Sequence, residues 1–98
     1  RLLSDRTVRQ ASTIQSRRRD VVVPFPLQWR LGYHRAPVSA RRLPNGFGHA
    51  GFGGSGAWAD PDRQLGVALV LNSGVGTPFG DLRILSIGNA VVRCAERR

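Results

Sequence analysis

The chain has 98 residues and a mass of 10.7 kDa, the size of one small domain or of a part of one. Its 15 basic residues are all arginines, and against six acidic residues they leave a net charge of +9. Because lysine is absent, the chain excludes a Schiff-base lysine, a P-loop lysine and a Ser-x-x-Lys catalytic pair. A single cysteine, Cys94, excludes an internal disulfide framework, and two histidines without further thiols exclude a Cys/His zinc finger.

Nothing in the sequence addresses the chain to a membrane. No run reaches the roughly eighteen apolar residues that a membrane-spanning helix needs, and the first residues lack the apolar core of a signal peptide. We therefore expect no membrane partner, no cofactor and no structural metal, and among the compartments we favour the cytoplasm. Since the sequence contains no methionine, Arg1 is not a translation start, and we expect a longer protein to continue upstream.

The first half of the chain predicts one helix and one strand. A short helix is expected over residues 4–15, with Ser4 as its cap, Asp5 in its first turn and apolar residues at roughly helical spacing. A half-buried strand is expected over residues 27–34, where apolar residues alternate with Gln28, Arg30, Gly32 and His34. Residues 36–46 are loop-like because they contain two prolines and an Asn-Gly turn pair.

The second half predicts a hairpin and a long helix. Strands are expected over residues 47–50 and 55–59, and Asp60-Pro61-Asp62-Arg63 is typical of a type I turn. Residues 65–71 are apolar at every position, which predicts a central strand covered on both faces. The last helix is expected to start at Thr77 and Pro78 and to run to about Glu96, with close backbone packing at Gly88. Its broad apolar arc comprises a stripe of Leu82, Leu85, Asn89 and Val92, with Ile84, Ile87, Val91 and Cys94 beside it.

Together these elements predict an α+β fold for residues 1–98, with an antiparallel sheet of three to four strands and the long C-terminal helix packed on one face. The N-terminal helix is too short to cover the other face. A small two-sided sheet with cover on one side only would be a weak fold. We therefore expect that the second face is covered by residues outside this chain or by a second copy, as in a homo-oligomer.

Two glycine-rich motifs lack the context that their usual function needs. Residues 46–51 and 51–56 both match G-x-G-x-x-G, but a dinucleotide site needs a strand before the motif and a helix after it, whereas here a loop precedes and a strand follows. Residues 53–57 resemble a nucleophile elbow, but the last position is Ala57 and no helix follows. We interpret Ser55 as a strand residue, and a Ser55–His49 catalytic pair would lack a well-placed acid.

The arginine clusters at residues 17–19, 41–42 and 97–98 are scattered and lack interleaved aromatic residues. We interpret them as solvated surface and expect no nucleic-acid partner. The alternative function is a non-catalytic binding or assembly module, in which the basic surface or an exposed sheet face meets an acidic partner.

A longer pattern is more specific. The stretch FGHAGFGGS at residues 47–55, followed by ADPDRQLGVA at residues 59–68 and by Leu71-Asn72, resembles the C-terminal part of the serine β-lactamase-like family. That family includes class C β-lactamases, D-alanyl-D-alanine carboxypeptidases and β-lactamase-fold esterases. Because Leu2-Leu3-Ser4 and Leu31-Gly32-Tyr33 also fit, the resemblance covers nearly the whole chain and implies a fragment of a β-lactamase-like fold.

The resemblance implies a function for residues 49–52. In that family a His/Lys-x-Gly element lines the active site, and here it corresponds to the substrate-binding residues His49, Ala50 and Gly51. Without a side chain, Gly51 would let an acyl substrate lie against the strand, and the backbone N–H of Phe52 would act as one oxyanion donor. A histidine where β-lactamases carry lysine resembles the esterase-like branch.

The same resemblance also shows what this chain lacks. The family's nucleophile lies in Ser-x-x-Lys and its base in Tyr-x-Asn, but the chain has no lysine, and Tyr33, the sole tyrosine, is followed by His34 and Arg35. The substrate implied for the full-length enzyme is a small ester or amide. We expect the chain alone to be inactive.

Overall fold

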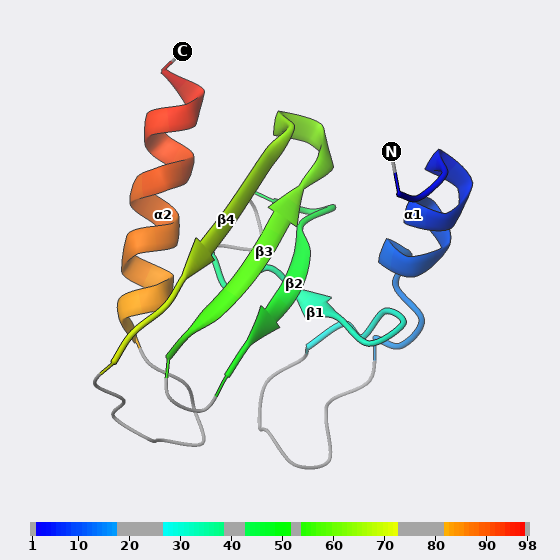
Figure 1. Ribbon diagram of the computed structural model, residues 1–98, viewed down its shortest axis with the longest axis horizontal. Coiled ribbons are helices and arrows are strands. Elements are labelled where there is room, and N and C mark those ends of the chain that lie inside the picture. The colour runs from blue at the N-terminus through cyan, green and yellow to red at the C-terminus, as the bar shows by residue number, and fades with distance from the viewer. Residues whose placement is uncertain (1, 18–26, 39–42, 52–53, 73–81, 98) are drawn as a thin grey trace.

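The computed structural model describes residues 2–17, 27–38, 43–51, 54–72 and 82–97. The elements in chain order are α1 (Asp5–Ser12), β1 (His34–Arg35), β2 (Phe47–Ala50), β3 (Gly56–Asp60), the 3₁₀ turn η1 (Pro61–Arg63), β4 (Leu65–Leu69) and α2 (Leu82–Glu96). The strands form one antiparallel sheet in the order β1-β2-β3-β4, with α2 beside β4 and α1 beyond β1 (Figure 1). The predicted α+β class is confirmed.

Helix α1 begins as predicted and ends earlier. The hydroxyl of Ser4 accepts a hydrogen bond from the backbone N–H of Thr7 at 3.1 Å, which confirms the predicted cap. The helix ends at Ser12, because the backbone N–H groups of Gln15 and Ser16 both donate to the carbonyl oxygen of Trp29 instead of continuing the helical ladder. No residue of α1 is buried.

The predicted strand over residues 27–34 is wrong, since strand β1 contains only His34 and Arg35. Gln28, with a φ of 51°, and Gly32, with a φ of 86°, have left-handed backbones that a regular strand does not contain. The backbone N–H of Arg30 donates to the carbonyl oxygen of Tyr33 at 2.7 Å and closes a local turn. The alternating pattern therefore belongs to a loop that folds back on itself.

The predicted hairpin is confirmed. Trp58 of β3 lies opposite Gly48 of β2 and opposite Val67 of β4. Between β3 and β4 the side chain of Asp60 accepts a hydrogen bond from the backbone N–H of Asp62 at 3.2 Å, and Pro61 occupies the start of η1, where its missing N–H costs nothing. Gln64, with a φ of 51°, then turns the chain back into β4.

Strand β4 is an edge strand and not the central, doubly covered strand that its continuous apolar sequence predicts. Its half-buried residues alternate with exposed ones, and Val70 just after it is 86% exposed. We call the surface opposite α2 the open face. Its exposed residues, placed on one side by the strand register, are His49, Ala57, Gly66 and Ala68.

The core lies between the sheet and α2. Val92 is completely buried and Trp58 is 4% exposed, and Ala36, Val38 and Leu43 complete this cluster. A Cβ atom on Gly88 would lie 2.8 Å from Val38 Cγ1, which confirms close packing at this glycine.

The predicted apolar stripe of α2 is rotated relative to the observed one. Ile84 and Val92 are buried, whereas Leu85 is 39% exposed. The face is set by Gly88, whose missing side chain admits Val38 and the ring of Trp58, so its neighbours one turn away on the same side become the buried ones. The helix ends at Glu96 as predicted, and its expected start at Thr77 and Pro78 lies outside the described residues.

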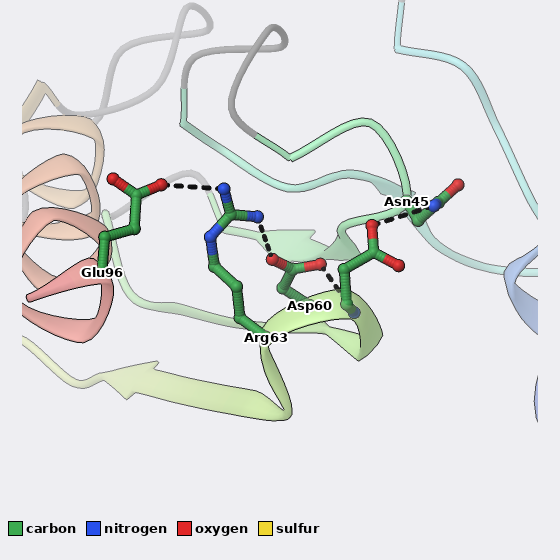
Figure 2. A network of polar contacts seen from close by, with 5 residues as sticks. Asn45, Asp60, Arg63 and Glu96 are labelled. Atoms are coloured by element: carbon green, nitrogen blue, oxygen red, sulfur yellow. Dashed lines mark hydrogen bonds and ion pairs between the residues drawn. The ribbon is translucent and has the colours of Figure 1, made fainter. Parts of the chain in front are cut away.

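A polar network joins the turn after β3 to the end of α2 (Figure 2). Asp60, whose side chain is fully buried, accepts a hydrogen bond from Arg63 Nη1 at 2.8 Å, and Arg63 Nη2 reaches Glu96 at the same distance. The hydrogen bonds that Arg63 donates to Asp60 and to Glu96 raise the pKa of Arg63. Asn45 extends the network by donating to Asp62 at 3.0 Å.

Candidate functional site

The predicted substrate-binding residues lie at the end of β2, and we call residues 49–51 the HAG segment. His49 pairs with Ala57 and is exposed on the open face. The preceding Gly48 faces the other way, and a Cβ atom there would lie 2.2 Å from the carbonyl oxygen of Ala57. Only glycine permits this approach of β2 to β3, and it leaves His49 directed away from the core.

Gly51 is exposed and closes the chain toward β3. Its backbone N–H donates to the carbonyl oxygen of Ser55 at 2.7 Å, and its own carbonyl oxygen accepts from the N–H of Gly54 at 3.1 Å. The backbone around Gly51 is therefore fixed on the β3 side. Phe52, the predicted oxyanion donor, lies outside the described residues, so its role stays a prediction.

Ser55 has a structural role at the same end of the sheet. Its hydroxyl oxygen accepts a hydrogen bond from the backbone N–H of Leu71 at 2.8 Å, which links the start of β3 to the chain after β4. Strand β3 begins at Gly56, so Ser55 lies one residue before the strand in which it was expected. No hydrogen bond between Ser55 and His49 is found in the described part of the chain.

Sequence reasoning missed His34, which contacts the HAG segment directly. This residue is 8% exposed, and its Nε2 accepts a hydrogen bond from the backbone N–H of Ala50 at 3.0 Å. Its Nδ1 lies 2.7 Å from the carbonyl oxygen of Arg35. Since a carbonyl oxygen only accepts and an amide N–H only donates, the ring is neutral with its proton on Nδ1.

Three rings gather around this contact. The ring centroids of His34 and His49 lie 4.9 Å apart. The ring of Trp29 is nearly perpendicular to that of His34, at 5.6 Å, and tilted relative to that of His49, at 6.2 Å. Burial lowers the pKa of His34, and the nearby bases His49, Arg30 and Arg35 lower it further against the opposing hydrogen bond to Arg35. The interior of the site therefore favours a neutral imidazole.

The predicted arginine clusters lie partly outside the described residues, since Arg18, Arg19, Arg41, Arg42 and Arg98 do. A different basic region is visible. A cavity of about 580 Å³ between α1 and η1 is lined by Arg9, Arg17 and Arg30, with Asp62 on its rim. Arg30 is buried there and donates to the carbonyl oxygens of Ser12 and Gln28.

Within the described ranges, no group of three or more His, Cys, Asp or Glu side chains is arranged to hold a metal ion. Neither of the two helices found there is long and apolar enough to cross a lipid bilayer.

Comparisons with known proteins show the family to which the chain belongs. A protein-family model described as Beta-lactamase matches residues 1–91. Among curated proteins, the chain is similar to "Esterase/beta-lactamase LipL" of Mycobacterium tuberculosis, with 41% identity over 69 residues, which cover 65% of this chain and 16% of that protein. The chain thus corresponds to a small part of this relative. No solved structure matches the chain.

Proposed function

Because the chain belongs to the β-lactamase family, we propose that it forms the C-terminal part of a β-lactamase-fold serine hydrolase acting on small ester or amide substrates. The relative from M. tuberculosis is named both an esterase and a β-lactamase, which supports this class of reaction. In this proposal the Ser-x-x-Lys and Tyr-x-Asn elements belong to other parts of a longer protein, and the present chain supplies one wall of the site.

The observation that carries the proposal is the position of the HAG segment. His49 and Gly51 are exposed at the end of β2, and His49 lies on the face opposite the packed core. The backbone N–H of Gly51 is bonded to Ser55 on the β3 side, whereas that of Ala50 points to the β1 side. Phe52, to which the family resemblance assigns the oxyanion donor, follows Gly51 directly and lies outside the described residues.

The chemistry proposed for this edge is acyl transfer. A serine oxygen outside the chain attacks the carbonyl carbon of the substrate, and the carbonyl oxygen takes up the negative charge. The backbone N–H of Phe52 donates to that oxygen, and such a donor contributes about 3 to 4 kcal/mol to transition-state stabilisation. The alcohol or amine then leaves with a proton, and water hydrolyses the acyl-enzyme. His49 would contact the substrate beside the reacting carbonyl.

Hydrolysis assays on two lengths of protein test this function. We expect the 98-residue chain to hydrolyse neither p-nitrophenyl butyrate nor nitrocefin, and the longer protein to hydrolyse the ester. In the longer protein His49→Ala should lower kcat/KM about 10-fold to 100-fold, the equivalent of one or two polar contacts to the substrate. If the 98-residue chain hydrolyses either substrate after contaminating enzymes have been removed, the proposal that the nucleophile lies outside this chain is wrong.

A second candidate function is supported by the arginine-lined cavity. Arg9, Arg17 and Arg30 share it with one carboxylate, so an anionic ligand or an acidic protein surface would complement it. Native mass spectrometry at several salt concentrations separates the two functions. A complex that dissociates as salt rises would favour this binding module, and a chain that shows no such complex would favour the hydrolase.

A further inference from the structure

We propose that His34 is a positioning residue for the HAG segment: its neutral imidazole holds the backbone of Ala50 in place, and protonation of His34 releases it. The effect on catalysis rests on the function proposed above. The hydrogen bond and its response to pH are properties of this chain alone, and they can be measured without any activity.

The backbone of β1 ends too early to hold the HAG segment. Its two residues pair with Phe47 and Gly48 only, so the ladder on this edge of β2 stops before His49. The next N–H on the edge, that of Ala50, is bonded by the side chain of His34 at 3.0 Å. An imidazole thus replaces the missing backbone acceptor at the point where the candidate site begins.

The hydrogen bond from Ala50 exists only while His34 is neutral. The Nδ1–H group of His34 donates to the carbonyl oxygen of Arg35, which leaves the lone pair on Nε2 to accept from Ala50. A protonated ring carries hydrogens on both nitrogens, so Nε2–H would meet the N–H of Ala50, donor against donor. Protonation therefore breaks the contact without moving any other residue first.

The positive form of His34 is supported by the hydrogen bond to the carbonyl oxygen of Arg35, but burial and the neighbouring charges outweigh this bond. The loop before β1 brings Trp29 and Arg30, β1 brings Arg35, and β2 brings His49. Burial lowers the pKa of His34 from its usual 6.5, and the charges of His49, Arg30 and Arg35 lower it further; among the described residues that act on the ring, none is a carboxylate. The switch therefore responds to acidification below the usual pKa of histidine.

Release of Ala50 would disturb both proposed contacts with substrate. His49 precedes Ala50 by one residue, and Phe52 follows Ala50 by two in the sequence. A displacement of about 1 Å in a catalytic arrangement can cost about 100-fold in rate. We therefore expect kcat to fall with acidification through the pKa of His34, with a smaller change in KM.

The first experiment is NMR spectroscopy of the ¹⁵N-labelled 98-residue chain and of the longer protein. Long-range ¹H–¹⁵N spectra should show His34 as the Nδ1–H tautomer with an apparent pKa below 6.5, and the amide of Ala50 should shift with that same pKa. An Nε2–H tautomer, or an Ala50 amide that does not follow His34, would overturn the proposal in either protein. This result does not depend on whether the function is right.

The second experiment compares two substitutions in the longer protein, with p-nitrophenyl butyrate as the substrate. His34→Gln keeps an acceptor at the position of Nε2 but does not titrate, so kcat should be retained and the acid limb of the pH profile should disappear. His34→Leu removes the acceptor and should lower kcat about 10-fold to 100-fold at every pH.

Two outcomes would reject the switch in that comparison. If His34→Gln keeps the acid limb, the limb belongs to another group. If His34→Leu has the kcat of the unaltered protein, Ala50 needs no acceptor. If the unaltered protein hydrolyses no ester, the proposed function fails, and the NMR result alone decides whether His34 positions Ala50.

Discussion

The sheet with α2 and the region of α1 with residues 27–33 are held together in different ways. The sheet and α2 are held together by buried side chains, and Trp58 and Val92 are almost completely buried. In the second, α1 buries no residue and is joined by hydrogen bonds to backbone atoms, from Leu31 to Ala11 and from the Arg30 side chain to Ser12. Since one such bond contributes only about 1 kcal/mol, we expect the α1 region to open before the sheet does.

The candidate site draws on both regions. The HAG segment belongs to the sheet, but its β1 edge is held by His34, which follows the loop that carries Trp29 and Arg30. A rigid strand thus depends for its last hydrogen bond on a less stable neighbour. Substitutions in the two regions should therefore differ in their effects on the stability of the sheet and on the candidate site.

The largest expected effect comes from Gly48→Ala in the sheet. A Cβ atom there would lie 2.2 Å from the carbonyl oxygen of Ala57 and 2.5 Å from Trp58 Cα, so β2 would have to separate from β3. We expect a loss of more than about 3 kcal/mol in the free energy of unfolding, measured by urea titration. Gly66→Ala is the matched control, because its added Cβ meets nothing within 4 Å. Equal destabilisation by both changes would show that the close approach is not the cause.

Asp60→Ala tests the polar network that joins the sheet to α2. The change removes the cap of η1 and leaves Arg63 without its buried partner, so we expect a loss of about 2 to 3 kcal/mol in chemical denaturation. The control Asn45→Ala removes an exposed hydrogen bond to Asp62 and should cost less than about 0.5 kcal/mol. If Asp60→Ala lowers the free energy of unfolding as little as Asn45→Ala does, the polar network does not stabilise the fold, because water replaces its hydrogen bonds.

The pH dependence of stability tests the contact between His34 and Ala50, which joins the two regions. The folded-state pKa of His34 is lowered, so between that value and 6.5 the unfolded chain binds a proton that the folded chain does not. Stability from His34 is thus complete above about pH 6.5 and is lost as the pH falls through the folded-state pKa. Urea titrations from pH 7.5 to pH 4.5 should show this loss, and His34→Gln should remove it. The same slope in His34→Gln would assign it to other groups.

The smallest expected effect comes from Ser4→Ala in α1. Loss of the cap should destabilise α1 by about 1 kcal/mol, seen as faster amide exchange within the helix. The urea midpoint of the sheet should not change, because α1 is not part of its core. Gln10→Ala, at an exposed position inside the helix, is the control. A lower urea midpoint in Ser4→Ala would show that the two regions unfold together.

The sequence allowed part of this fold to be predicted, where local pattern and long-range packing agree. The hairpin around Asp60-Pro61, the cap at Ser4 and the close packing at Gly88 all follow from local chemistry. The alternation over residues 27–34 was misleading because positive φ angles at Gln28 and Gly32 override it. The apolar run of β4 gave no sign that one of its faces is the open face.

The candidate site divides in the same way. The HAG segment was predicted from the resemblance to a known family, and its function stays a prediction; the structure places the segment at an exposed strand end. His34 was missed because its partner, Ala50, is 16 residues away, and no spacing rule joins a side chain to a distant backbone N–H. Contacts of this kind become visible only when β1 is placed beside β2.

The most direct test of the proposed acyl-transfer wall is the response of the HAG segment to a bound transition-state analogue. The longer protein, labelled with ¹⁵N, would be treated with a phosphonate ester that attaches to its reactive serine. Our account predicts selective shifts of the Phe52 amide and the His49 ring, with the core resonances of Trp58 and Val92 unchanged. A fully attached phosphonate that leaves both Phe52 and His49 unshifted would contradict it.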